Sequence, residues 1–177
     1  LGEQVIIGRL ISLRFTGIAI GLVYLWVQSL VGKRPALWAL FFLSISPLSI
    51  RYSVTFMPEA TVFLFYMAAL YLFDKWLKHE SRLLLLLTAF CTALMILVKP
   101  TSIHIGLIFL LLLLKQHGVK VFLRIDLWAF AVISILPSVL WYLHARELYL
   151  DYGNTFGVIS GGDSKLGNFS YWLSPMF

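Results

Sequence analysis

Three ionisable residues of this sequence lie beside helix-start signals in apolar surroundings: Arg51, Glu59 and Lys99. Glu59 closes the triplet Met57-Pro58-Glu59, and proline suits the first position of a helix because its missing N–H would be unpaired there anyway. The helix dipole stabilises a carboxylate in the first turn by roughly 0.3–1 kcal/mol. An ionised group inside a bilayer costs about 2.5–3.5 kcal/mol, so such groups tend to line polar cavities and function there. We therefore expect Glu59 to be catalytic; a helix-start acid at a membrane interface is the structural alternative.

Lys99 and Arg51 have the properties of a phosphate site. In Val98-Lys99-Pro100 the proline disfavours helical geometry at Lys99 and opens the next helix. The lysine charge and the free N–H groups of a helix start then concentrate positive potential at one point, which suits a phosphate. Arg51 offers a planar fork of donors that grips phosphate, unless it only extends to the interface as a solvated cation. His104 is a further candidate, although a lone histidine near a helix start is more often merely hydrogen-bonded.

The composition requires a membrane around these residues. Hydrophobic residues make up 60% of the 177 residues and charged residues 12%, and no soluble domain of this size could hide so much apolar surface. The net charge of +6 then reports topology and anionic lipid headgroups and not nucleic-acid binding. The single cysteine, Cys91, excludes an internal disulfide, and the scattered histidines show no metal-ligand spacing.

Six apolar stretches predict an all-α, polytopic bundle of about six transmembrane helices. A spanning helix needs about 20 mostly apolar residues. The stretches cover residues 10–31, 36–50, 58–73, 83–98, 101–114 and 127–143. We expect a loosened end of the second helix near Ser46-Pro47 and a kink at Pro137. Residues 1–144 form the predicted bundle, and residues 145–177, which are richer in Gly, Ser, Asp and Asn, a predicted extracytoplasmic loop.

Basic residues fall mainly in alternate gaps between the stretches. One set of gaps holds Lys33, Arg34, Lys75, Lys78, Arg82, Lys115, Lys120 and Arg124. The opposite set holds only Arg51, Lys99, and later Arg146 and Lys165. The positive-inside rule places the first set in the cytoplasm, so Arg51, Glu59 and Lys99 are expected on the extracytoplasmic side.

An ordered set of short segments carries a family resemblance. The segments are Arg9-Leu10-Ile11-Ser12, Val23-Tyr24, Gly32-Lys33-Arg34, Ala36-Leu37-Trp38-Ala39-Leu40, Ser46-Pro47, Arg51-Tyr52-Ser53, Met57-Pro58-Glu59-Ala60 and Leu97-Val98-Lys99-Pro100. In this order and spacing they resemble the GT-C membrane glycosyltransferases, and most of all the bacterial protein mannosyltransferase and aminoarabinose transferase type. The resemblance covers residues 8–115 well and the rest loosely.

The resemblance implies an enzyme of the bacterial inner (plasma) membrane that is active on the extracytoplasmic face. Such enzymes move a sugar from a polyprenyl-phosphate donor to an acceptor with inversion, while a carboxylate activates the acceptor. Glu59 matches the second acidic position of the family, and Arg9, Arg51, Lys99 and His104 are the expected substrate-binding residues. The family's main acidic residue lies in a loop that we expect to precede this sequence, so the chain is expected to be an incomplete, inactive part of a longer protein.

A bare carboxylate beside a phosphate would repel it, so either a bridging divalent cation, Mg or Mn, or a bridging proton is expected between the two; the resemblance does not decide between them. The expected partners are the polyprenyl-phosphate sugar donor and membrane lipids, with no nucleic acid; the sequence does not identify the acceptor. The alternative is a polytopic lipid or solute transporter without transferase activity. A transporter should place ionisable residues near the bilayer midplane, whereas here they cluster at helix starts on one side.

Overall fold

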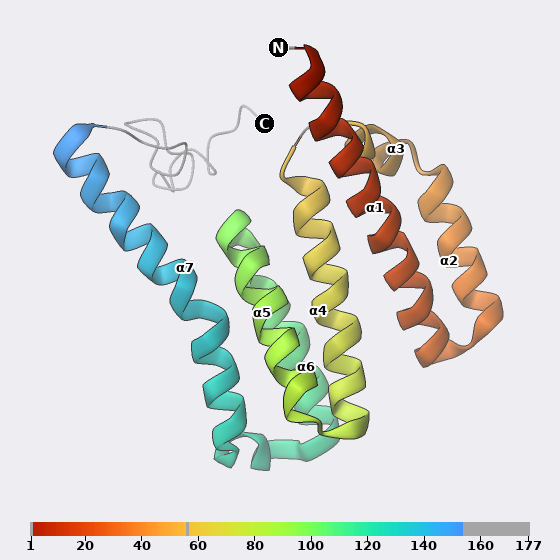
Figure 1. Cartoon of the computed structure of the whole chain (residues 1–177). Coiled ribbons are helices and arrows are strands. Elements are labelled where there is room, and N and C mark those ends of the chain that lie inside the picture. The colour runs from red at the N-terminus through yellow and green to blue at the C-terminus, as the bar shows by residue number, and fades with distance from the viewer. Residues whose placement is uncertain (1, 56, 154–177) are drawn as a thin grey trace, which may run out of the picture. The chain divides into compact units, whose positions relative to one another are not determined.

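The structure, a computed structural model, describes residues 2–55 and 57–153. Within this part the chain is helical and contains no strand (Figure 1). The elements are α1 (Gly2–Val31), α2 (Lys33–Ile45), α3 (Pro47–Ser53), α4 (Glu59–His79), α5 (Arg82–Val98), the 3₁₀ helix η1 (Pro100–His104), α6 (Ile105–His117), the 3₁₀ helix η2 (Gly118–Leu123) and α7 (Ile125–Tyr152). The expected all-α fold is confirmed.

The expected second helix is two helices. Residues 36–50 were predicted as one stretch, but α2 ends at Ile45 and α3 begins at Pro47, with a bend of 64° between them. Ser46 has φ −61° and ψ 123°, an extended conformation. Proline disfavours helical geometry in the residue before it, which explains why the chain turns at Ser46.

The other boundaries extend the expected stretches. α4 continues six residues past Phe73 to His79, so Lys75 and Lys78 lie on the helix and not in a loop. α7 continues through Pro137 to Tyr152, which corrects the expectation of a loop from residue 145. The rest of that predicted loop, residues 154–177, lies outside the described residues. The chain divides into two compact units, Leu1–Ser138 and Val139–Phe177, at a point inside α7.

Several helices are long and apolar enough to cross a membrane. In the described part these are four segments, Ile6–Val31, Glu59–His79, Pro100–Leu123 and Ile125–Tyr152, and the bent pair α2–α3 makes a fifth if it is one span. The apolar helix α5, with 17 residues, is shorter. Large apolar side chains such as Phe42, Leu107 and Trp128 are about 60% exposed, as expected of helices that face lipid. The fold is that of a polytopic membrane protein.

The core lies between α4, α5, α6 and the first half of α7. Phe73 on α4 is fully buried, stacks on Phe109 at 4.2 Å between ring centroids, and contacts Phe130 at 6.0 Å. On α5, Thr88 and Thr92 are buried, and each hydroxyl donates to a backbone carbonyl four residues earlier. These satisfied hydroxyls, with the small residues Ala89 and Ala93, let α5 pack closely on α4.

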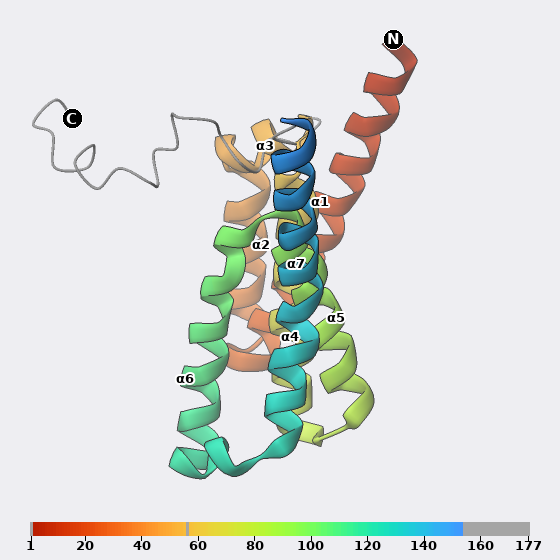
Figure 2. The ribbon, with the colours of Figure 1, turned by 90° about the vertical axis from the view of Figure 1, so that its left-hand side faces the viewer.

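The charged residues near the helix ends form two groups, one at each end of the helices. The turns after α1, α4 and α6 lie at one end, while α3, the start of α4 and the α5–η1 junction lie at the other (Figure 1 and Figure 2). We call the first the basic end, because it holds Lys33, Arg34, Lys75, Lys78, Arg82, Lys115, Lys120 and Arg124. We call the second the site end. Gly32 makes the first turn at φ +94°, a conformation that side chains other than glycine rarely adopt.

Candidate functional site

Glu59 and Lys99 meet at the site end. The Nζ of Lys99 lies 3.5 Å from Oε1 of Glu59, although the two residues are 40 positions apart in the sequence. Glu59 is the first residue of α4 and follows Pro58, as the sequence predicts. Lys99 is the linking residue between α5 and η1, with φ −147° and ψ 100°, so it is held out of helical geometry before Pro100 as expected.

Backbone hydrogen bonds fix Lys99 at this position. Its N–H donates to the carbonyl of Met95 at 3.0 Å, and its own carbonyl accepts from the N–H of Ser102 at 2.9 Å. Lys99 is therefore both the C-cap of α5, to which it donates a hydrogen bond, and the N-cap of η1, from which it accepts one. These two hydrogen bonds hold the backbone of Lys99 on both sides, while its side chain is partly exposed.

The two carboxylate oxygens of Glu59 differ. Oε1 faces Lys99, whereas Oε2 is buried and has no hydrogen-bond partner among the described residues. The pair itself is partly exposed, with 47% of the Lys99 side chain and 34% of the Glu59 side chain accessible. A loose pair of this kind contributes about 0–1 kcal/mol to stability. A buried acceptor without a donor is costly, so Oε2 has an unmet need for a hydrogen-bond donor.

Glu59 borders two cavities. The first has a volume of about 210 Å³ and is lined by Glu59, Val62, Phe63, Tyr66, Met67 and Lys99; we call it the Lys99 cavity. The second, of about 230 Å³, is lined by Thr16, Leu43, Leu48, Ser49, Tyr52, Glu59, Ala60 and Phe63; we call it the Tyr52 cavity. Both are smaller than the 300–1,000 Å³ or so of a typical small-molecule site, so each suits a headgroup better than a whole lipid.

Tyr66 is a residue of the Lys99 cavity that the sequence analysis missed. Its hydroxyl lies 3.2 Å from Nε2 of His104, and Nδ1 of His104 lies 2.8 Å from the carbonyl oxygen of Thr101. His104 thus reaches the region of Glu59 and Lys99, as expected, but through Tyr66. The spacing could have revealed Tyr66, because residues 59, 62, 63 and 66 share one face of a helix.

Arg51 does not join Glu59 and Lys99 as expected. It lies in the last turn of α3 with an exposed side chain, and it lines neither cavity. The bend at Ser46 accounts for this, since it turns toward Glu59 the face of α3 that carries Leu48, Ser49 and Tyr52. Arg9 is exposed on α1 and also lines neither cavity. Substrate binding by Arg51 and Arg9 stays a prediction.

The described residues do not by themselves supply a divalent cation site. Among them, no group of three or more His, Cys, Asp and Glu side chains is close enough to hold a metal ion. At the site end, the carboxylate of Glu59 has the ammonium group of Lys99 beside it, where a second acidic ligand would be needed. A role for Mg or Mn stays a prediction.

Asp74 is a buried carboxylate that the sequence analysis did not single out. Its Oδ2 accepts hydrogen bonds from Ser29 on α1 at 2.9 Å and from Lys78 on α4 at 2.7 Å. The carboxylate therefore joins α1 to α4, and its buried charge has a cationic partner. With these donors in place, Asp74 has the contacts of a structural residue.

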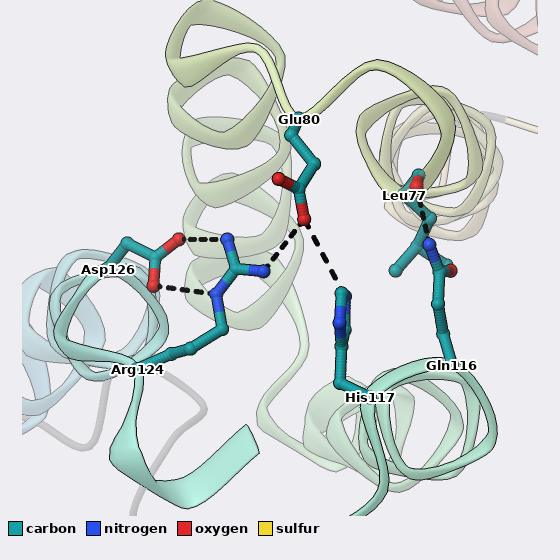
Figure 3. A network of polar contacts seen from close by, with 6 residues as sticks. All are labelled: Leu77, Glu80, Gln116, His117, Arg124 and Asp126. Atoms are coloured by element: carbon teal, nitrogen blue, oxygen red, sulfur yellow. Dashed lines mark hydrogen bonds and ion pairs between the residues drawn. The ribbon is translucent and has the colours of Figure 1, made fainter. Parts of the chain in front are cut away.

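A second polar network lies at the basic end (Figure 3). Arg124 donates to Glu80 at 2.8 Å and makes two hydrogen bonds with Asp126, at 3.1 and 2.7 Å. His117 approaches Glu80 at 3.8 Å, too far for a hydrogen bond, and Gln116 donates to the carbonyl of Leu77 at 2.7 Å. The hydrogen bond and charge of Arg124 lower the pKa of Glu80 below its ordinary value. The guanidinium of Arg124 donates to both Glu80 and Asp126, so this network joins the α4–α5 turn to the start of α7.

The comparisons with known proteins identify the family. No similar curated protein and no similar solved structure is found. The family model described as dolichyl-phosphate-mannose-protein mannosyltransferase matches residues 1–142, which include the whole of the site described above. This match agrees with the helical membrane fold and with the resemblance seen in the sequence. The chain belongs to the dolichyl-phosphate-mannose-protein mannosyltransferase family of membrane glycosyltransferases.

Proposed function

We propose that the protein transfers a sugar, mannose by the family's description, from a polyprenyl-phosphate donor to an acceptor on the extracytoplasmic face of the membrane. The observation that carries this proposal is the Glu59–Lys99 pair at the Lys99 cavity. It combines a cation, which suits a phosphate, with an unpaired carboxylate oxygen, which suits a hydroxyl.

In the proposed reaction, Lys99 binds the phosphate of the donor. The bond between the acceptor oxygen and the anomeric carbon forms as the bond from that carbon to the phosphate oxygen breaks. The phosphate leaves with the bonding electrons, and the ammonium group of Lys99 stabilises the negative charge that develops there. The loose 3.5 Å contact with Glu59 lets Lys99 turn toward the phosphate at little cost.

Glu59 acts on the sugar side of the same cavity. Its Oε2 accepts a hydrogen bond from a sugar hydroxyl and so holds the ring in place for attack. The acceptor proton goes to a general base, which the family resemblance assigns to the main acidic residue of another loop. Lys99, between the carboxylate and the phosphate, offsets the repulsion between these two anions.

The orientation follows from the charges at the two ends. The basic end collects eight Lys and Arg residues, so the positive-inside rule assigns it to the cytoplasm and the site end to the outside. Val62, Phe63 and Met67 give the Lys99 cavity an apolar wall. Such a wall suits a lipid-linked donor whose phosphate meets Lys99.

A donor comparison tests this proposal. The full-length protein, reconstituted in liposomes, is given radiolabelled polyprenyl-phosphate mannose or radiolabelled GDP-mannose, with membrane extract as the source of acceptor. We expect release of polyprenyl phosphate and transfer of label from the lipid-linked donor alone. Transfer from the nucleotide sugar, or none from any polyprenyl-phosphate sugar, would overturn the proposal.

A further inference from the structure

Tyr66 and His104 form a second cross-link beside Glu59 and Lys99. The Tyr66 hydroxyl lies 3.2 Å from His104 Nε2, and the two rings are 5.5 Å apart between centroids. Tyr66 lines the Lys99 cavity, and His104 is the last residue of η1. The cavity therefore has one polar pair at the start of α4 and another further along the same helix.

The spacing of the two pairs agrees on both helices. Tyr66 follows Glu59 by seven residues on α4, which is a rise of about 10 Å. His104 follows Lys99 by five residues, one in extended geometry and four in the 3₁₀ geometry of η1, which is a rise of about 11 Å. Side-chain contacts therefore link Lys99, which precedes η1, and His104, which ends it, to residues of the first two turns of α4.

When His104 is neutral, its hydrogen bond to Thr101 sets the direction of the Tyr66 proton. A backbone carbonyl can only accept, so Nδ1 of a neutral His104 carries the proton that it donates to Thr101. Nε2 is then an acceptor, and the Tyr66 hydroxyl donates to it. The Tyr66 oxygen is left with lone pairs and no proton to offer the cavity.

We propose that Tyr66 is a sugar-binding residue that accepts a hydrogen bond from a donor-sugar hydroxyl, with His104 as the residue that positions it. This inference rests on the proposed function and specifies which part of the donor each residue contacts. A phosphate offers only acceptors at its ionised oxygens, so the Tyr66 oxygen cannot pair with it. A hydroxyl can donate to Tyr66. Lys99 therefore takes the phosphate, and Tyr66, about 10 Å along α4 from Glu59, takes a hydroxyl of the sugar.

A substrate-variant cycle tests the contact. Tyr66→Phe removes the acceptor and keeps the ring, so kcat/KM for polyprenyl-phosphate mannose should fall about three- to tenfold, the loss expected for one neutral hydrogen bond. Wild-type enzyme should lose a similar factor with one monodeoxy-mannose donor, and Tyr66→Phe should lose nothing further with that donor. Tyr71→Phe, on the same helix near the basic end, is the matched control and should behave as wild type.

Variants of His104 test its role in positioning Tyr66. They also provide a second test of the inference if Tyr66→Phe does not fold. Glutamine places an oxygen acceptor near the site of Nε2, whereas leucine places none. We expect His104→Leu to lower kcat/KM several-fold and His104→Gln to restore most of that loss. The inference would be overturned if Tyr66→Phe lowered kcat/KM by the same factor with every deoxy donor. It would also be overturned if His104→Leu and His104→Gln had equal kcat/KM. Wild-type transfer in the same assay separates this failure from a failure of the proposed function.

Discussion

Lys99 and Glu59, 40 positions apart in sequence, lie with Nζ and Oε1 3.5 Å apart at the site end. Each follows or precedes a proline that fixes the local backbone: Pro58 before Glu59, and Pro100 after Lys99. The packing of α4 on α5 then brings Glu59 and Lys99 together. The ion pair is weak, so its position is set by these backbone features and not by its own energy.

The charge of Lys99 should determine donor affinity. Lys99→Ala should weaken binding of polyprenyl-phosphate mannose about ten- to hundredfold, the effect of losing a hydrogen bond to a charged group. The KM for the acceptor should stay within about twofold. Kinetics of the reconstituted full-length protein measure both, with Lys120→Ala at the basic end as the control. An unchanged donor affinity would reject the phosphate contact.

The proline after Lys99 should matter through the backbone. Pro100→Ala allows α5 to continue through Lys99, which would turn its side chain away from Glu59. We expect donor affinity to fall several-fold, less than in Lys99→Ala, with folding retained. Pro35→Ala in the first turn of α2 is the matched control, since this exposed proline lies at the basic end. Equal donor affinity of both variants would show that the extended geometry of Lys99 is not required.

The sequence predicted the positions of site residues that adjoin a proline at a helix start. It did not predict positions that depend on the angle between two helices. Glu59 and Lys99 were found because Pro58 and Pro100 define their local geometry. Arg51 was misplaced because the 64° bend at Ser46 sets which face of α3 meets α4, and an angle between helices is not encoded in local spacing. Tyr66 was missed because an aromatic residue in an apolar helix looks the same whether it faces lipid or a cavity.

The Glu80–Arg124 contact should make the folding stability of the protein depend on pH. The folded pKa of Glu80 is lowered, so the unfolded chain binds the proton more tightly, and the stability from this contact is present at neutral pH. It is lost as pH falls from about 5 through the lowered pKa. Thermal unfolding in detergent should therefore show a smaller loss of Tm on acidification for Glu80→Gln than for wild type. The exposed control Glu147→Gln should follow wild type; a Glu80→Gln curve parallel to wild type would contradict this.

The buried Asp74 should matter for stability and not for chemistry. Asp74→Ala removes the acceptor shared by Ser29 and Lys78 and should destabilise the protein by about 1–3 kcal/mol. Unfolding in detergent measures this loss, and Asp151→Ala at an exposed position of α7 is the control. Activity per folded molecule should be unchanged. A fall in kcat without a loss of stability would give Asp74 a functional role that its contacts do not suggest.

The most direct measurement is the transfer rate of Glu59→Gln in the reconstituted full-length protein with polyprenyl-phosphate mannose. Glutamine keeps the shape of the side chain but removes the charge beside Lys99 and one of the two carboxylate acceptors. We expect a fall in kcat/KM of about a hundredfold or more, with expression, membrane insertion and Tm unchanged. Turnover equal to wild type, in a variant that is folded and inserted, would contradict the assignment of Glu59 and Lys99 as the site.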